Sequence, residues 1–400
     1  MSRAISVSCR YVLVAAVVLS LAGCTGHKAV PALSTTRSIT PTPSPSLELG
    51  CGASACPTVS APTGLFPGRL LTYATHGFTA AELAKVTAHV AGPVTAVYSS
   101  EQTLASNEPA YPMTPVATLL TDGPSYAAAV GEPALAGELD GGIVLAQTEA
   151  ELRGATTGGT ITLADNKVLP ITAVVPDQVI GGYEMATSNQ VLTTPATQPA
   201  AYLLVGGMSG VAALTAVMTA QLPGRSVRVR QTTANGFLSS YDTVLTQLEV
   251  KRRFGEFSIK QSSSGGFVPD SSWLAQWIRT VTVPQLGQVQ CNKAILPDLI
   301  AAMKEVTSRG LGSIVHTADF QREGGCFNPR ITRFSDGGSL STHSWGIAVD
   351  INVDDNPLGA KPKQDPRLVS IMAAHGFTWG GRWLRPDGAH FEWTGTALAG

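Results

Sequence analysis

Three things are scarce in this sequence, and each scarcity narrows what the chain can do. Charged residues make up only 14% of its 400 residues, and the formal net charge is −1. A nucleic-acid-binding protein needs clustered positive charge, so this composition offers no electrostatic case for a nucleic-acid partner. After residue 21 no stretch is apolar and long enough to cross a bilayer. The cysteines form no Cys-x-x-Cys pair, which argues against a zinc site built from thiolates.

The first residues have the pattern of an export signal. Arg3 and Arg10 precede an apolar run from Tyr11 that ends in Leu21-Ala-Gly-Cys24. Such a run is typical of a secretion signal and is too short for a comfortable transmembrane helix. Leu-Ala-Gly-Cys resembles the bacterial lipobox, in which the cysteine is lipidated and becomes the mature N-terminus. We therefore expect residues 1–24 to be a lipoprotein signal peptide and the mature protein to be extracytoplasmic, anchored to the bacterial cell membrane by lipid; an ordinary signal peptide with a chance cysteine is the alternative.

The cysteine count suggests disulfides. Four cysteines remain once the signal is removed and Cys24 is acylated: Cys51, Cys56, Cys291 and Cys326. An even number in an oxidising compartment is typical of a disulfide framework. Cys51 and Cys56 could close a small loop, and Cys291 could be joined to Cys326.

Composition and periodicity divide the remaining chain into three parts. Residues 25–64 are rich in Thr, Pro and Ser and predict a disordered linker. Residues 65–246 alternate helix and strand patterns, with helix caps at Thr79-x-x-Glu82 and Thr148-x-x-Glu151 and a hairpin signal at Asp165-Asn166. They predict a separate mixed α/β domain without chemistry of its own, a spacer or a site for a protein partner. This region resembles the extracytoplasmic domains of MacB/FtsX-type permeases. Residues 247–400 form the third part.

The chemistry of the sequence lies in that third part. It contains Ser341-x-His343-x-x-Gly-x-Ala-x-Asp350, then Trp-Gly-Gly-Arg-Trp383, then Asp387-x-x-His390-Phe-Glu-Trp. Two histidines and one aspartate supply three nitrogen or oxygen ligands, the number a catalytic zinc needs if its fourth position is to hold water. Asp387 stands three residues before His390, close enough to serve that water as a base.

Strand periodicity predicts how these side chains meet. In residues 347–353 the apolar side chains alternate, so Asp350 and Asn352 should share the opposite face. In residues 390–393 His390 and Glu392 share a face in the same way. Each strand should bury its apolar side and turn its ligand towards a common cleft. Glu392 is then either a carboxylate that orients a ligand or a solvated side chain.

These motifs resemble those of the VanY-like D-alanyl-D-alanine carboxypeptidase family of zinc peptidases, which includes L-alanyl-D-glutamate peptidases and shares its fold with the hedgehog signalling domain. The resemblance implies an α+β fold with a small antiparallel sheet and helices on one face. It implies that His343, Asp350 and His390 bind Zn²⁺ and that Asp387 is the general base. It also suggests Arg330, in Cys-Phe-Asn-Pro-Arg330, as a substrate-binding cation. Arg382 departs from the pattern, because relatives more often carry a small acidic or amide residue there.

The resemblance implies a cell-envelope zinc metallopeptidase. Its substrates would be peptidoglycan stem peptides, cut by a D-Ala-D-Ala carboxypeptidase or an endopeptidase. Retention of Asp387 favours catalysis, since a base lost to Asn or Ala would have argued against it. The alternative is a zinc-containing lipoprotein that binds the cell wall or signals without hydrolysis.

Overall fold

A computed structural model describes residues 69–194, 197–206, 208, 210–231, 245–263, 266–322, 325–331 and 339–395. All of them belong to one compact unit, Ser60–Gly400. The predictions about the signal peptide, the linker, Cys24, Cys51 and Cys56 lie outside the described residues. In the part of the chain that is described, no helix has both the length and the apolar character needed to cross a membrane.

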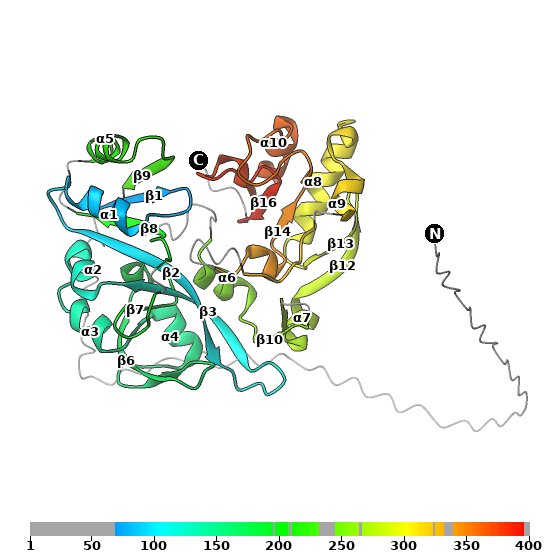
Figure 1. The fold of residues 1–400 in the computed structure, drawn as a ribbon. Coiled ribbons are helices and arrows are strands. Elements are labelled where there is room, and N and C mark those ends of the chain that lie inside the picture. Colours follow the sequence, from blue (N-terminus) through cyan, green and yellow to red (C-terminus); the bar gives the residue numbers. More distant parts are fainter. Residues whose placement is uncertain are drawn as a thin grey trace, which may run out of the picture. The chain divides into compact units, whose positions relative to one another are not determined.

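The larger sheet mixes parallel and antiparallel strands (Figure 1). Its strands are β1 Leu70–Ala74, β2 Val94–Ala105, β3 Met113–Thr121, β4 Ile143–Ala146, β5 Thr160–Thr162, β6 Val168–Val175, β7 Met185–Ser188, β8 Tyr202–Val205, β9 Val227–Gln231, β10 Ile259–Gln261 and β11 Phe267–Pro269. Their order is β5-β6-β4-β7-β3-β2-β8-β1-β9, and β10 joins β11 to β3. The pairs β3–β7 and β4–β6 are parallel. This is the mixed α/β architecture that the alternating patterns predicted.

The helices of this region are α1 Ala80–Thr87, α2 Gly123–Val130, α3 Leu135–Gly141, α4 Gln147–Arg153, α5 Val211–Gln221 and the short η1 Asp177–Ile180. The capping box at the start of α1 is confirmed, because Thr79 accepts from the Glu82 amide and Glu82 accepts from the Thr79 amide. The cap predicted at Thr148 is wrong. Helix α4 already begins at Gln147, and the amide and hydroxyl of Thr148 both donate to Asp177.

The predicted hairpin is confirmed. Strands β5 and β6 pair antiparallel on either side of Asp165-Asn166. Asn166 has a φ of +69°, a left-handed conformation that asparagine tolerates better than most residues. The Asp165 side chain accepts a hydrogen bond of 3.0 Å from the Lys167 amide.

The C-terminal part has its own buried core, drawn from residues between Leu245 and Phe391. Its elements are α6 Gln247–Phe254, α7 Ser271–Trp277, β12 Ile278–Val283, β13 Gly287–Asn292, α8 Leu296–Ser308, η2 Gly312–Ile314, α9 Thr317–Arg322, η4 Thr342–Trp345, β14 Ala348–Asp350, α10 Pro366–Ala374, β15 Phe377–Trp379, η5 Gly380–Arg382 and β16 His390–Trp393. Strands β14, β16 and β15 pair antiparallel in that order. The predicted α+β fold with a small antiparallel sheet is therefore confirmed.

Helices α8 and α10 pack against each other beside this small sheet (Figure 1). The apolar spacing of Leu299, Met303 and Val306 gives α8 one buried face. Helix α10 begins where the sequence predicted, with Asp365 accepting from the Arg367 amide at 2.8 Å and Pro366 in the first turn. The two helices thus lie beside the sheet that carries Asp350 and His390.

A disulfide joins Cys291 of β13 to Cys326, with their Cα atoms 5.3 Å apart. It ties the segment that precedes Arg330 to the C-terminal core, where both cysteines are buried. The sequence had suggested this pairing as one possibility, and the structure confirms it.

Helix α6 lies where the sequence predicted the boundary between residues 65–246 and 247–400. Leu248 packs into a core made mainly of residues between 71 and 204, whereas Val250 and Phe254 pack into the C-terminal core. One helix therefore contributes to both cores, and the boundary at residue 246 stays a prediction.

Candidate metal centre

The register of the small sheet brings Asp350 and His390 together. In the antiparallel pair β14–β16, Asp350 lies directly opposite His390 and Val349 opposite Phe391. Side chains directly opposite each other across two antiparallel strands lie on the same face. Asp350 Oδ1 is accordingly 3.0 Å from His390 Nδ1, while Val349 and Phe391 are buried in the core.

A tight turn places His343 against this pair. Ser341 caps η4 by accepting from the His343 amide at 3.3 Å, and Gly346 ends it with a φ of +65°. A Cβ atom at Gly346 would lie 2.8 Å from the amide nitrogen of Asn292, so both the conformation and the space require glycine. The chain returns into β14, and His343 Nε2 lies 3.1 Å from Asp350 Oδ2 and 3.2 Å from His390 Nδ1.

These three side chains fit a single metal ion. His343 Nε2 and His390 Nδ1 are 3.2 Å apart, and each lies 3.0–3.1 Å from one of the two carboxylate oxygens of Asp350. Ligand atoms at about 2.0–2.1 Å from a tetrahedral zinc would be about 3.3 Å apart. His343 Nδ1 lies 2.7 Å from the carbonyl oxygen of Cys326. Nδ1 must donate in that bond, which leaves a lone pair on Nε2 to face the centre. The group His343, Asp350 and His390 can thus hold a metal ion.

The second nitrogen of His390 points away from the centre. His390 Nε2 lies 3.8 Å from Glu392 Oε2, and Glu392 is fully buried. At 3.8 Å the contact is electrostatic and longer than a hydrogen bond. Of the two interpretations of Glu392, burial excludes the solvated side chain.

The electrostatics of the site favour a cation. Burial alone would raise the pKa of Asp350, but His343 and His390 hold it well below its ordinary value. Burial lowers the pKa of His390, whereas Asp350, Glu392 and Asp387 together raise it to about 10. Asp350 is therefore ionised at neutral pH, and the surrounding carboxylates stabilise positive charge between the two imidazoles.

Asp387 lies beside this group, between η5 and β16. Its amide donates to the carbonyl of Gly380 at 3.0 Å. Burial raises the pKa of the Asp387 carboxyl; Asp350 raises it further, and His390 and His343 oppose the shift. The charges of all three predicted ligands thus act on the Asp387 carboxyl, and its role as the base stays a prediction.

The Trp-Gly-Gly-Arg-Trp segment forms a wall next to His390. The ring of Trp383 lies 5.1 Å from the His390 ring, centroid to centroid, and Trp379 Nε1 donates to the Gly388 carbonyl at 2.9 Å. A Cβ atom at Gly381 would lie 2.2 Å from the Trp379 ring, so a larger residue does not fit there. The Trp-Gly-Gly-Arg-Trp motif by itself does not predict that Trp383 packs on His390.

Arg330 reaches the rim of the site. Its Nη2 lies 3.9 Å from Asp350 Oδ2, and 40% of its side chain is exposed. Its amide donates to Ser344 Oγ at 3.0 Å, and its carbonyl accepts from the Ser341 amide at 3.0 Å. Arg330 is thus fixed by its backbone to the turn that carries His343, while its guanidinium remains open to a ligand.

Asn352 does not share the face of Asp350, so that prediction is wrong. Strand β14 ends at Asp350, and Asn352 adopts a φ of +59°. Its side chain is buried, accepts from the His316 amide at 2.8 Å and donates to the Gln364 side chain at 2.7 Å. It holds the loop after β14 together.

Comparison with known proteins identifies one segment of the chain. Residues 335–393 match the family model described as D-alanyl-D-alanine carboxypeptidase. The matched range contains His343, Asp350, Asp387 and His390. The C-terminal part therefore carries a domain of this family. A search of curated proteins found no match.

Two solved structures were found that are similar to the middle region. One is the periplasmic region of MacB from Actinobacillus actinomycetemcomitans, with 10% identity and a TM-score of 0.32 over 44% of this chain and 94% of that chain. The other is a domain of a putative permease protein from Porphyromonas gingivalis, with 13% identity and a TM-score of 0.28 over 41% of this chain and 88% of that chain. Likenesses at this level support no statement about what this chain does.

Proposed function

Since residues 335–393 carry a D-alanyl-D-alanine carboxypeptidase domain, we propose that the chain is a zinc peptidase that hydrolyses peptidoglycan stem peptides. It acts as a D-Ala-D-Ala carboxypeptidase or as an endopeptidase. The observation that carries this proposal is the convergence of His343 Nε2, Asp350 and His390 Nδ1 within 3.2 Å of one another. Asp387 beside them makes the arrangement suited to hydrolysis as well as to binding.

His343, Asp350 and His390 hold the zinc ion in this proposal. A zinc ion bound there supplies Lewis acidity and makes an adjacent water molecule easier to deprotonate. The carboxylate of Asp387 takes the proton of the attacking water and later gives it to the leaving amine. Burial raises the pKa of Asp387, which makes its carboxylate a better proton acceptor than an exposed aspartate.

Two further side chains position the substrate. The guanidinium of Arg330, partly exposed and 3.9 Å from Asp350, pairs with a carboxylate of the stem peptide. The indole of Trp383 packs on His390 and shields that ligand from water. Arg382, the residue before Trp383, is exposed and offers a further cation to an anionic substrate.

The proposed location follows from the N-terminal sequence. We propose that Cys24 carries a lipid that anchors the protein outside the bacterial membrane, where peptidoglycan lies. A binding partner for residues 65–246 remains a prediction.

The test is mass spectrometry of isolated muropeptides after incubation with the full-length protein and zinc. Wild type should remove D-Ala or split the stem peptide, and a chelator should stop the reaction. Asp387→Asn should bind zinc normally and lose about 10²-fold or more in rate, the usual range for a missing general base. Asp355→Asn, on the exposed loop after β14, is the matched control and should behave as wild type. Wild type that binds muropeptides and leaves all of them intact would contradict the proposal and favour a non-hydrolytic wall-binding lipoprotein.

A further inference from the structure

A carboxylate from the middle region contacts the segment that carries His343. Glu101 lies in the middle of β2, where it pairs with Ala117 of β3. Its Oε2 accepts a hydrogen bond of 3.3 Å from the Leu340 amide. Leu340 stands three residues before His343, although Glu101 is 239 residues away from it in the chain.

The backbone contacts of Leu340 and Ser341 connect Glu101 to His343. Leu340 is buried and bridges to Ile331. The next residue, Ser341, donates its amide to the Arg330 carbonyl and caps η4 through the His343 amide. The position of the Leu340 amide therefore sets where η4 begins, and with it where the imidazole of His343 points.

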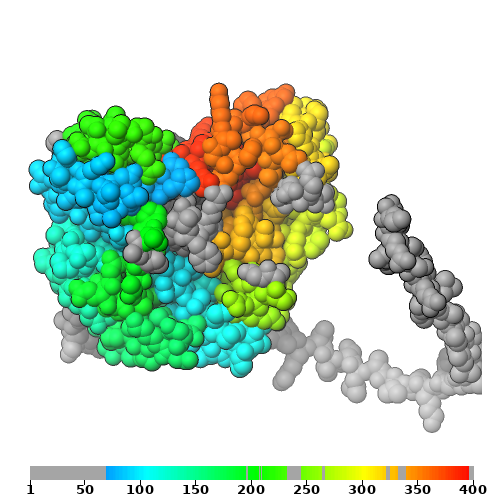
Figure 2. All heavy atoms as spheres, viewed as in Figure 1, coloured from blue at the N-terminus to red at the C-terminus, as the bar shows by residue number. Residues whose placement is uncertain are grey.

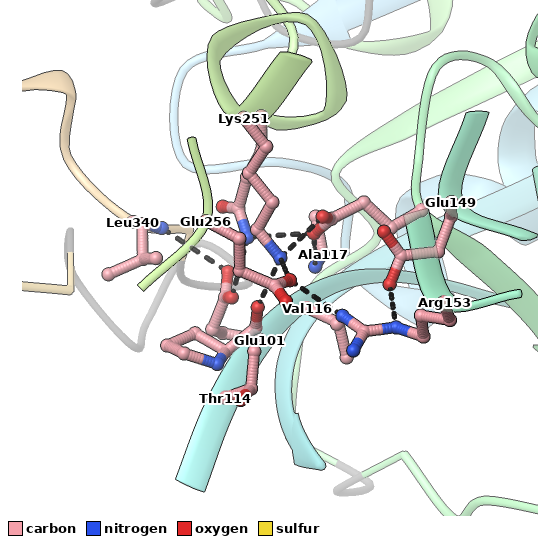
Figure 3. A network of polar contacts seen from close by, with 12 residues as sticks. Glu101, Thr114, Val116, Ala117, Glu149, Arg153, Lys251, Glu256 and Leu340 are labelled. Atoms are coloured by element: carbon pink, nitrogen blue, oxygen red, sulfur yellow. Dashed lines mark hydrogen bonds and ion pairs between the residues drawn. The ribbon is translucent and has the colours of Figure 1, made fainter. Parts of the chain in front are cut away.

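Glu101 is itself held by a network of buried charges (Figure 3). Its Oε1 accepts from Gln247 Nε2 at 2.8 Å, and the same amide nitrogen donates to Glu184 at 2.8 Å. The ammonium of Lys251 lies 2.5 Å from Glu184 and 2.8 Å from Glu256. Gln247 of α6 thus holds one oxygen of the Glu101 carboxylate, while the other oxygen contacts Leu340.

This network leaves no place for a second metal ion. Glu149, Glu184 and Glu256 have ligand spacing, but Lys251 already contacts the latter two. Arg153 lies 2.5 Å from Glu149 and 2.6 Å from Glu256. Because cations of the chain occupy the space between these carboxylates, the cluster is structural.

A second contact joins the middle region to the Trp-Gly-Gly-Arg-Trp segment beside His390. Arg228 of β9 donates from Nη2 to the carbonyl of Arg382 at 3.3 Å. Leu384 packs against the core that contains Leu71 and Leu204. On the face shown in Figure 2, the C-terminal segment in red meets segments in blue and green from the middle region. Residues 70–231 therefore touch both the His343 turn and the segment that ends at His390.

We propose that Glu101 is a positioning residue for the metal centre: through Leu340 it holds the turn that aims His343 at Asp350 and His390. The middle region is then a part of the site and more than a spacer. The inference rests on one part of the proposed function, namely that His343, Asp350 and His390 bind zinc.

The test measures zinc affinity of the full chain by competition with a chromophoric chelator, so that it does not depend on hydrolysis. Glu101→Ala removes the acceptor and should weaken zinc binding about tenfold or more, as is typical when a group that orients a ligand is lost. Glu101→Gln keeps an oxygen for the Leu340 amide and should retain the affinity. Should Glu101→Ala fail to fold, Glu101→Leu fills similar volume without an acceptor and carries the same expectation.

The matched control is Glu149→Gln. Glu149 belongs to the same network and is buried, but its salt bridge is to Arg153. This variant should be less stable than wild type and yet bind zinc with unchanged affinity. Unchanged zinc affinity in Glu101→Ala and Glu101→Leu, or an equal loss in Glu149→Gln, would overturn the inference. Wild type that binds no zinc would instead refute the proposed function, so the two failures are distinguishable.

Discussion

Replacing Lys251 by methionine should strongly destabilise the fold, because it leaves buried carboxylates without their cation. Lys251 is 3% exposed and Glu184 is fully buried. The ammonium also donates to the Pro115 carbonyl at 2.6 Å. Removing one partner of a buried ion pair costs about 3–5 kcal/mol, so we expect Lys251→Met to lower the free energy of unfolding by about that amount at pH 8.5.

The cost should depend on pH. Burial raises the pKa of Glu184 to about 8, although Lys251 lowers it. Below pH 8 the Glu184 carboxyl takes up a proton in the folded protein, and less is lost when the cation is missing. We therefore expect the effect of Lys251→Met to be smaller at pH 5 than at pH 8.5.

Urea denaturation at both pH values, followed by tryptophan fluorescence, measures this difference. The double variant Lys251→Met/Glu184→Gln should recover part of the lost stability at pH 8.5, because it removes a buried carboxyl that must otherwise stay ionised without its cation or take up a proton. A cost below about 1 kcal/mol, the size expected of an exposed pair, or a cost that is the same at both pH values would refute the reasoning.

Other predictions follow from the same structure. The raised pKa of Glu184 means that the folded state binds a proton that the unfolded chain has released; its contribution is full below about pH 4 and is lost as the pH rises through about 8. The free energy of unfolding of the zinc-loaded wild type should therefore fall between pH 5 and 8.5, and Glu184→Gln should flatten that slope in urea titrations. Gly346→Ala should cost at least about 1–2 kcal/mol from its left-handed φ alone and also weaken zinc binding in chelator competition; wild-type values would contradict the account of the turn. The double variant Cys291→Ala/Cys326→Ala should lose about 3–4 kcal/mol in thermal unfolding, since the disulfide closes a loop of 35 residues. Cys24→Ser should move the protein from the detergent phase to the aqueous phase in Triton X-114 partitioning, and equal partitioning of both forms would exclude a lipid at Cys24.

Much of the site could be predicted from local patterns. The alternation of apolar and polar residues in 390–393 places His390 and Glu392 on one face, and the structure shows the same. The position of Asp350 follows from the same rule. The turn at Gly346 could be predicted because only a glycine suits so sharp a return of the chain.

The limits of the local pattern are visible at Asn352. Alternation predicted that it would share a face with Asp350, but the strand ends there and Asn352 turns into the left-handed region. In the loop the side-chain amide of Asn352 forms hydrogen bonds with the His316 amide and the Gln364 side chain. Hydrogen bonds with residues distant in the chain overrode the periodicity.

Contacts between the two regions could not be predicted at all. Nothing near Glu101 in the sequence marks it as a partner of Leu340, and nothing near Arg228 points to Arg382. The ion network around Lys251 is likewise assembled from β2, α4 and α6. Such pairs depend on how two cores pack, and a single sequence has no local pattern that encodes this.

X-ray absorption at the zinc edge tests the central claim most directly. The zinc-loaded protein should show one ion per chain with a first shell of nitrogen and oxygen at about 2.0–2.1 Å and the outer-shell scattering of two imidazoles. His343→Ala should lose one imidazole contribution. A sulfur-containing shell, or a spectrum that is unchanged in His343→Ala and His390→Ala, would contradict the assignment of this group as the metal centre.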